Sequence, residues 1–187
     1  MMRLLEKRED GLITSAEIEK LSGWSSHTIR RDISYLGSVG CSAGYDTQKV
    51  AQLIQVALGL DRKRHICVVG LGRLGSAFLN AGVELLNKEF ELAAGFDSNV
   101  NRVEILKSSA PLYPAYKMGE IIRRFSIELA LLCVPAEAAQ QAAEKLAASG
   151  ITGILNFAPV SLSLPPEIAV RNVYLLDELR SLAIMLH

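Results

Sequence analysis

Three glycines at positions 70, 72 and 75 form a G-x-G-x-x-G pattern directly after an apolar run over residues 65–69. The apolar run predicts a buried parallel strand. Gly70 permits a tight turn out of that strand, and Gly72 lets the backbone approach a pyrophosphate. Gly75 lets the following helix pack closely on the sheet, so that the phosphates lie at the N-terminus of the helix.

A second apolar run, residues 92–96, follows the expected helix and ends in Asp97. A carboxylate at the end of this strand is where the ribose hydroxyls of a dinucleotide are held. A glycine-rich turn without function is the alternative, but strand, glycine loop, helix, strand and acid occur here in the required order. Ser98 and Asn99 follow Asp97, with no Lys or Arg beside it. Asp97 should therefore repel a 2′-phosphate, which favours NADH and NAD⁺ over their 2′-phosphorylated forms.

The composition fits a globular protein of one or two domains, with 187 residues, half of them hydrophobic, and a formal net charge of zero. Residues 1–64 hold ten basic and eight acidic side chains. This mildly basic balance permits nucleic-acid binding without requiring it.

The cysteines and the apolar runs indicate the compartment. Cys67 and Cys133 fall within strand-like apolar runs, which predicts buried thiols in a reducing compartment. Neither a CxxC motif nor a Cys/His pair has the spacing of a metal site. No apolar run approaches the length of a membrane span, and the first residues lack a signal-peptide core. We therefore expect a cytoplasmic protein with no membrane partner.

Two short helices are predicted near the N-terminus. Thr14 or Ser15 begins the first, which ends at residues 22–23, and the second spans residues 24–37 with an apolar face. Two helices joined by a tight turn are typical of a helix-turn-helix, although a solvated face in an ordinary helical bundle fits the pattern equally well. The polar face of the second helix provides the candidate DNA-binding residues: Ser25, Ser26, His27, Arg30, Arg31, Ser34 and Tyr35.

The segments around these helices complete the expected first domain. Residues 1–10 are predicted to be the end of a helix, and the Gly- and Ser-rich residues 37–45 a hairpin or wing. A helix is expected over residues 48–58. The charged run at 59–64 is expected to be a solvated linker, which places the boundary of the first domain at residues 1–64.

Strands and helices alternate after the linker, which predicts an α/β fold with a doubly wound parallel sheet over residues 65–174. Further strands are expected at 110–113, 127–134, 151–157 and 172–176, with a helix at 137–149. Ligands of such sheets bind at the carboxyl ends of the strands. The candidate cofactor-binding residues are therefore Gly70, Leu71, Gly72, Arg73, Leu74, Gly75, Asp97, Ser98, Val134, Pro135, Asn156, Phe157, Ala158 and Pro159.

The last helix, within residues 175–187, is too apolar for a solvated tail. It either packs on its own domain or inserts into a partner subunit, which would make a homodimer.

The order of motifs resembles the Rex family of redox-sensing transcriptional repressors, in which a winged helix precedes an NAD(H)-binding Rossmann domain. The residues that carry the resemblance are 28–38, 69–77, 134–140 and 150–159. The resemblance implies a homodimer that binds palindromic operator DNA, is competent to bind with NAD⁺ and is released by NADH. It also implies that the C-terminal helix swaps between subunits and inserts between the two kinds of domain.

The sequence departs from the family pattern at three places. The chain starts within the first helix, so an Arg that usually reaches the NAD-binding domain is missing. Tyr174 stands where the family has the answering Asp, and the wing at 40–45 lacks its usual basic residue. A dinucleotide-binding dimer with weakened DNA binding, acting as a modulator, is therefore the alternative function.

An NAD-dependent oxidoreductase is the rival class. A dehydrogenase needs an acid or base near the hydride. None of the three histidines, His27, His65 and His187, lies at the carboxyl end of a predicted strand, and only 30 residues follow Phe157. We therefore expect no enzyme activity. The reduced nicotinamide lacks the positive charge of the oxidised ring, so an apolar pocket near Pro135 and Ala158 should prefer it.

Overall fold

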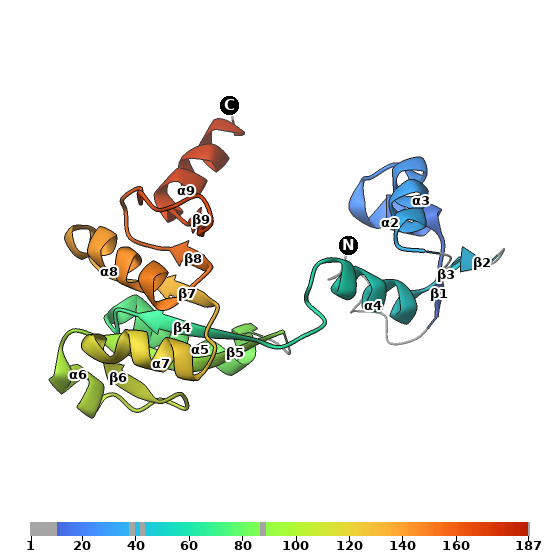
Figure 1. Ribbon diagram of the computed structural model, residues 1–187. Coiled ribbons are helices and arrows are strands. Elements are labelled where there is room, and N and C mark those ends of the chain that lie inside the picture. The colour runs from blue at the N-terminus through green and yellow to red at the C-terminus, as the bar shows by residue number, and fades with distance from the viewer. Residues whose placement is uncertain (1–10, 38–39, 42–43, 87–88, 187) are drawn as a thin grey trace. The chain divides into compact units, whose positions relative to one another are not determined.

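The computed structural model describes residues 11–37, 40–41, 44–86 and 89–186 and divides the chain into two compact units, residues 1–62 and 63–187 (Figure 1). The helix end expected within residues 1–10 and much of the expected wing lie outside the described residues. Within the described ranges, no helix combines the length and apolar character needed to cross a membrane.

The first unit combines helices with a small antiparallel sheet. The sheet has the order β1-β3-β2, with β1 at Leu12–Ile13, β2 at Gly40–Cys41 and β3 at Gly44–Asp46. The helices are α2 (Ser15–Ser22), α3 (Ser26–Tyr35) and α4 (Thr47–Ala57). The expected pair of short helices is thus confirmed as α2 and α3, and strand β1 is an addition that the sequence pattern did not show.

Local hydrogen bonds explain why α2 and α3 begin and end where they do. Thr14 and Glu17 form a reciprocal capping box at the start of α2, and Gly23 ends that helix in the left-handed conformation, with φ of 75°. Ser25 caps α3 by accepting a hydrogen bond from the backbone N–H of Thr28. Apolar side chains from β1, α2, α3 and α4 form one buried core in this unit: Ile13, Ile18, Ile29, Ile33, Val50 and Ile54.

The described residues of the second unit form a six-stranded parallel sheet of order β6-β5-β4-β7-β8-β9, which confirms the expected doubly wound fold. Its strands are β4 (Arg64–Val69), β5 (Phe90–Asp97), β6 (Leu112–Pro114), β7 (Leu129–Leu132), β8 (Gly153–Asn156) and β9 (Ala169–Asn172). The crossover direction reverses between β4 and β7, and ligands bind at such a point.

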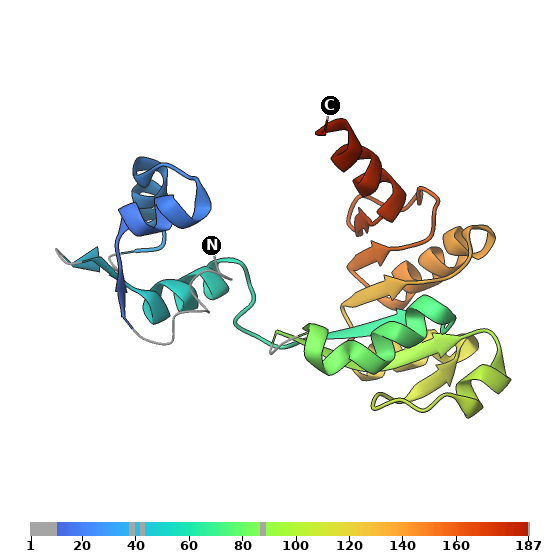
Figure 2. The same cartoon turned by 180° about the vertical axis from the view of Figure 1, so that it is seen from behind.

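Helices cover both faces of this sheet. From the two opposite sides in Figures 1 and 2, α7 and α8 lie on one face and α5 lies on the other. These helices are α5 (Arg73–Leu86), α7 (Met118–Arg124) and α8 (Ala136–Ser149). A short helix α6 (Val100–Ile105) follows β5, and a 3₁₀ turn η1 (Ala115–Lys117) precedes α7. Helices α6 and α7 were not expected from the sequence pattern.

One expectation about the end of this unit was wrong. The final strand expected at 172–176 lies earlier, as β9, because residues 169–172 pair with β8. The backbone carbonyl of Tyr174 then accepts from the N–H groups of Asp177 and Glu178, which starts helix α9 (Leu175–Ile184).

Residues 61–63 of the charged run at 59–64 are exposed, as expected of a solvated linker, and its last two residues form ion pairs. Lys63 Nζ lies 3.0 Å from Glu91 Oε2, and Arg64 Nη1 lies 2.9 Å from Glu128 Oε2. The bond from Lys63 holds the pKa of Glu91 below its usual value. These two ion pairs therefore hold the end of the charged run at the amino-terminal ends of the strands, where β4 begins.

Candidate dinucleotide-binding site

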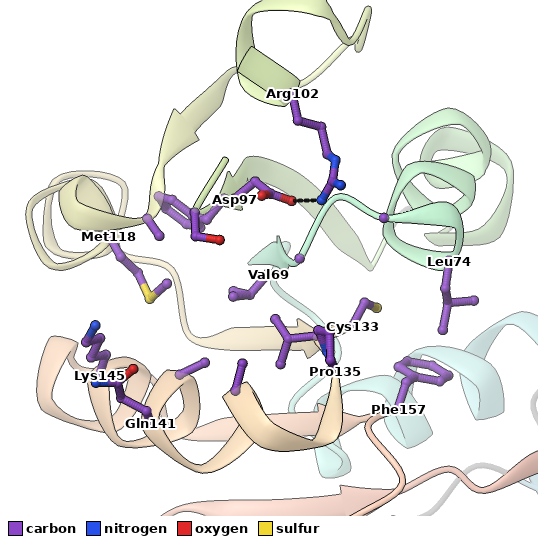
Figure 3. Close-up of a pocket in the computed structure, with 18 residues that line it drawn as sticks. Val69, Leu74, Asp97, Arg102, Met118, Cys133, Pro135, Gln141, Lys145 and Phe157 are labelled. Carbon is purple, nitrogen blue, oxygen red and sulfur yellow. Dashed lines mark hydrogen bonds and ion pairs between the residues drawn. The ribbon is translucent and has the colours of Figure 1, made fainter. Parts of the chain in front are cut away.

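A pocket of about 580 Å³ lies at the carboxyl ends of β4, β5 and β7 (Figure 3). Eight of the predicted cofactor residues line it: Gly70, Gly72, Leu74, Asp97, Ser98, Val134, Pro135 and Phe157. The pocket therefore brings together four separated parts of the sequence: the glycine loop, the end of β5, the segment after β7 and the segment after β8.

The three glycines have different structural roles. Gly70 has a φ of +89°, and a Cβ atom there would lie 2.7 Å from the carbonyl oxygen of Cys133. A Cβ atom on Gly75 would lie 1.9 Å from the carbonyl oxygen of Gly70. Gly72 has open space within 4 Å of its Cβ position and lines the pocket. Gly70 and Gly75 thus set the close packing of the loop, and Gly72 leaves room for a ligand.

Asp97 is almost fully buried and accepts three hydrogen bonds. The backbone N–H groups of Leu71 and Asn99 donate to it over 2.7 Å each, and Arg102 Nη1 donates over 2.9 Å. The expectation that no cation lies beside this acid is therefore wrong. Asn99 caps α6, and this helix turns the chain back so that Arg102 reaches the end of β5.

Asn156 organises the loop after β8 instead of lining the pocket. Its Nδ2 donates to the carbonyl oxygen of Val160 and to Asn172 Oδ1, and its Oδ1 accepts from the N–H of Ala158. Ala158 is buried, Pro159 is exposed, and neither lines the pocket. Of the four residues expected from this segment, the structure brings only Phe157 to the pocket.

Leu71, Arg73 and Gly75 also do not line the pocket. The side chain of Leu71 packs with Val68 and Leu79, and its contribution to the site is the N–H group that reaches Asp97. Arg73 is exposed at the first position of α5. These residues support the glycine loop from outside the cavity.

One wall of the pocket was missed from the sequence. It comes from η1, α7 and one face of α8: Ala115, Met118, Ala138, Gln141, Ala142 and Lys145. The positions on α8 follow the i, i+3, i+4, i+7 spacing of a single helix face. Since this helix follows directly after a strand whose carboxyl end lines the site, that spacing was the available signal.

Cys133 lines the pocket but packs as an apolar side chain against the cluster of Val68, Leu71 and Leu79. Burial raises the pKa of its thiol to about 12. At neutral pH the thiol is protonated and therefore a poor nucleophile.

The candidate nucleic-acid face lies on α3. The hydroxyl groups of its serines are already used: Ser25 pairs with Thr28, Ser26 with Glu19, and Ser34 donates to the carbonyl of Arg31. The exposed residues of this face with reach toward a partner are therefore His27, Arg30, Arg31 and Tyr35. Arg31 Nε lies 3.6 Å from Asp32 Oδ1, a contact between two exposed side chains.

The chain is similar to proteins of known family. Residues 61–160 match the family described as CoA binding domain. The redox-sensing transcriptional repressor Rex 1 of Enterococcus faecalis is 36% identical over the whole chain, which covers 86% of that protein. The Rex protein of Ligilactobacillus salivarius is 35% identical, again over the whole chain and 87% of the relative. The chain belongs to the Rex family of redox-sensing transcriptional repressors.

Solved Rex structures share the fold of both units. A crystal structure of RSP, a Rex-family repressor, matches with a TM-score of 0.84 and 30% identity, covering 99% of this chain and 88% of that one. RSP in complex with β-NAD⁺ and operator DNA matches with a TM-score of 0.88 and 28% identity, over 99% and 87% of the two chains. The similarity therefore extends over both units of the chain, the N-terminal helical unit and the Rossmann-like unit.

Substitution of two glycines of the loop should separate packing from ligand access. Gly75→Ala should destabilise the second unit by about 1–3 kcal/mol, because its Cβ atom would overlap the carbonyl oxygen of Gly70. Gly72→Ala places a Cβ atom in open space and should change the unfolding free energy by less than about 1 kcal/mol. Urea unfolding of both variants measures the difference, and equal stabilities would contradict the packing role of Gly75.

Proposed function

We propose that this protein is an NADH- and NAD⁺-responsive transcriptional repressor that binds palindromic operator DNA as a homodimer and is released by NADH. One observation carries the proposal: a single chain holds both parts that such a repressor needs. The first is a capped helix pair with an exposed basic face, and the second is a glycine-loop pocket where the strand order of the parallel sheet reverses. The similarity to RSP, solved with β-NAD⁺ and operator DNA and also with β-NADH, supports it.

The polarity of the pocket provides a physical basis for sensing. The glycine loop seats the pyrophosphate, and the Asp97 end takes the adenosine ribose. Val134, Pro135 and Phe157 then surround the nicotinamide with apolar surface, whereas the charged lining residues Asp97, Arg102 and Lys145 lie away from Phe157 (Figure 3). The neutral reduced ring is less costly to bury there than the cationic oxidised ring. Such a difference in affinity is what allows a ligand to shift a conformational equilibrium.

The pocket is built for binding more than for turnover. The described lining residues include no histidine, and the carboxylate of Asp97 is already hydrogen-bonded to three donors. His27 lies on α3, and His65 donates through Nδ1 to the carbonyl of Phe125, at the start of β4. We therefore propose that the bound dinucleotide acts as a signal and is not consumed.

Helix α9 and the sheet together support the homodimer. Large apolar side chains of α9 and of the two residues after it are more than half exposed: Leu175, Leu176, Leu179, Leu182, Ile184, Met185 and Leu186. In both views α9 extends away from the sheet (Figures 1 and 2). A groove of about 350 Å³ with apolar walls, including Ile66, Leu131 and Leu155, lies over the sheet. We propose that α9 swaps between subunits and that association buries both apolar surfaces.

Release from DNA should depend on the oxidation state of the dinucleotide. A duplex selected from a random library by the NAD⁺-loaded protein should be released by NADH, at an NADH concentration at least about fivefold below that of the NAD⁺ present. Fluorescence anisotropy measures the release. The matched control is Gly72→Ala, which should bind the duplex but respond to neither dinucleotide, because its Cβ atom occupies the path of the pyrophosphate. Equal release by NADH and NAD⁺ would refute the sensing mechanism. If no duplex is selected, the alternative function, a dinucleotide-binding dimer with weakened DNA binding, is favoured.

Arg30 should contribute a contact to DNA phosphate or a base edge. Arg30→Gln should weaken duplex binding and reduce the slope of log K against log salt by about one, while NADH affinity is unchanged. Arg123→Gln, an exposed substitution on α7 of the other unit, is the charge-matched control. If Arg30→Gln and the control behave alike, α3 is not the DNA-contacting helix.

A charge on the apolar side of α9 should dissociate the homodimer. Leu179→Glu places a carboxylate in the proposed interface and should yield monomers, whereas Ser181→Glu, on the polar side of the same helix, should leave dimers. Size-exclusion chromatography with light scattering distinguishes the two states. Dimers of both variants would show that α9 does not form the interface.

A further inference from the structure

The ring of Phe157 provides aromatic surface at the end of the pocket that lies away from Asp97 and Arg102 (Figure 3). Local hydrogen bonds fix the backbone here. The N–H of Phe157 donates to the carbonyl oxygen of Leu132 over 2.9 Å, and the N–H of the next residue donates to Asn156 Oδ1 over 3.0 Å. Since the backbone is held, the position of the ring depends on its own side-chain torsions and on the side chains that contact it.

Phe78 of helix α5 contacts this ring without lining the pocket itself. The centroids of the two rings are 5.0 Å apart, and the ring planes are tilted by 44°. This separation lies in the range in which aromatic pairs attract each other. On its other sides Phe78 packs with the apolar cluster of Val68, Leu71 and Leu79. Phe78 can therefore act on a ligand only through the ring of Phe157.

The contact with Phe78 restricts the ring of Phe157. A smaller side chain at position 78 would leave an unfilled volume beside this ring, because the surroundings of a truncated side chain relax only in part. The ring would then be free to turn away from a ligand, and water would reach the place that the ring had covered. A neutral nicotinamide would lose more by this change than a cationic one, because burial in dry, apolar surroundings favours the neutral form.

We propose that Phe78 is a positioning residue for the nicotinamide end of the pocket: it holds the ring of Phe157 against the ligand and thereby sets the preference for NADH over NAD⁺. The inference rests on the proposed function, because it assumes that the nicotinamide lies beside Phe157. It adds a side chain of α5 that does not touch the ligand to those that determine which oxidation state is bound more tightly.

Isothermal titration calorimetry of the full-length protein with NADH, NAD⁺ and ADP-ribose tests this role. Phe78→Ala should weaken NADH binding about tenfold and NAD⁺ binding less than about threefold, so the ratio of the two dissociation constants should fall at least about threefold. ADP-ribose has no nicotinamide ring, so its affinity should change less than about twofold. Phe78→Leu fills most of the vacated volume and should restore the ratio to within about twofold of the native value.

Leu92→Ala is the matched control. Leu92, on β5, packs against the same apolar cluster as Phe78 and does not line the pocket. Its truncation should lower the free energy of unfolding, as Phe78→Ala does, without changing the affinity for any of the three ligands. Urea unfolding measures this loss and checks that each variant is folded. Phe78→Val, a smaller truncation, should lower the ratio in the same direction, so the test does not depend on the folding of Phe78→Ala.

The outcomes separate this inference from the proposed function. If the native protein prefers NADH and the truncations at position 78 keep the native ratio, the inference is wrong and the proposed function stands. Equal loss of affinity for NADH, NAD⁺ and ADP-ribose would show that Phe78 only supports the fold, which also refutes the inference. If the native protein binds NADH and NAD⁺ with equal affinity, the pocket does not distinguish the oxidation states, and both proposals fail.

Discussion

The hydrogen bond from the backbone N–H of Leu71 to the carboxylate of Asp97 joins the two parts on which the site depends. It is buried, spans 2.7 Å and links the glycine loop to the carboxyl end of β5. The N–H of Gly70 donates to the carbonyl of Phe96 just beside it. A buried carboxylate is stable only when its charge is compensated, so the loop geometry and the acid require one another. The site is therefore preformed, which reduces the ordering cost of binding.

Sequence patterns predicted those parts of the fold and site that depend on local interactions. Glycine spacing located the loop, apolar runs located β4 and β7, the capping residue Thr14 located α2, and the apolar face of residues 24–37 located α3. Arg102 and Asn156 were misjudged for a different reason. The partners of Asn156 include Asn172, 16 positions away on β9, and Arg102 reaches Asp97 only because α6 turns the chain back. The contact of Asn156 depends on tertiary packing, and that of Arg102 on a short helix without an apolar stripe, and periodicity encodes neither.

Strand β4 connects the two ends of the dinucleotide unit. It begins at Arg64, where the charged run ends, and it leads at Val69 into the glycine loop. Lys63, just before β4, pairs with Glu91 of β5, and Arg64, its first residue, pairs with Glu128 just before β7. Strand β4, in the centre of the sheet, thus directly connects the glycine loop to the segment that leads to the first unit. Rigid elements of this kind transmit a shift only if the ligand distinguishes two arrangements of the protein.

A redox-responsive protein can sense the redox state through its own thiols or through a bound dinucleotide. The two cysteine side chains that the structure describes favour the dinucleotide. Cys67 is fully buried in β4, and burial raises the pKa of its thiol far above the usual value. Cys133 borders the pocket, yet its pKa of about 12 leaves almost no thiolate at neutral pH. Oxidation of cysteine proceeds through the thiolate, so both side chains are poor sensors. The two described thiols therefore favour sensing through the dinucleotide, in agreement with the proposal that the apolar surface around Phe157 distinguishes its two forms.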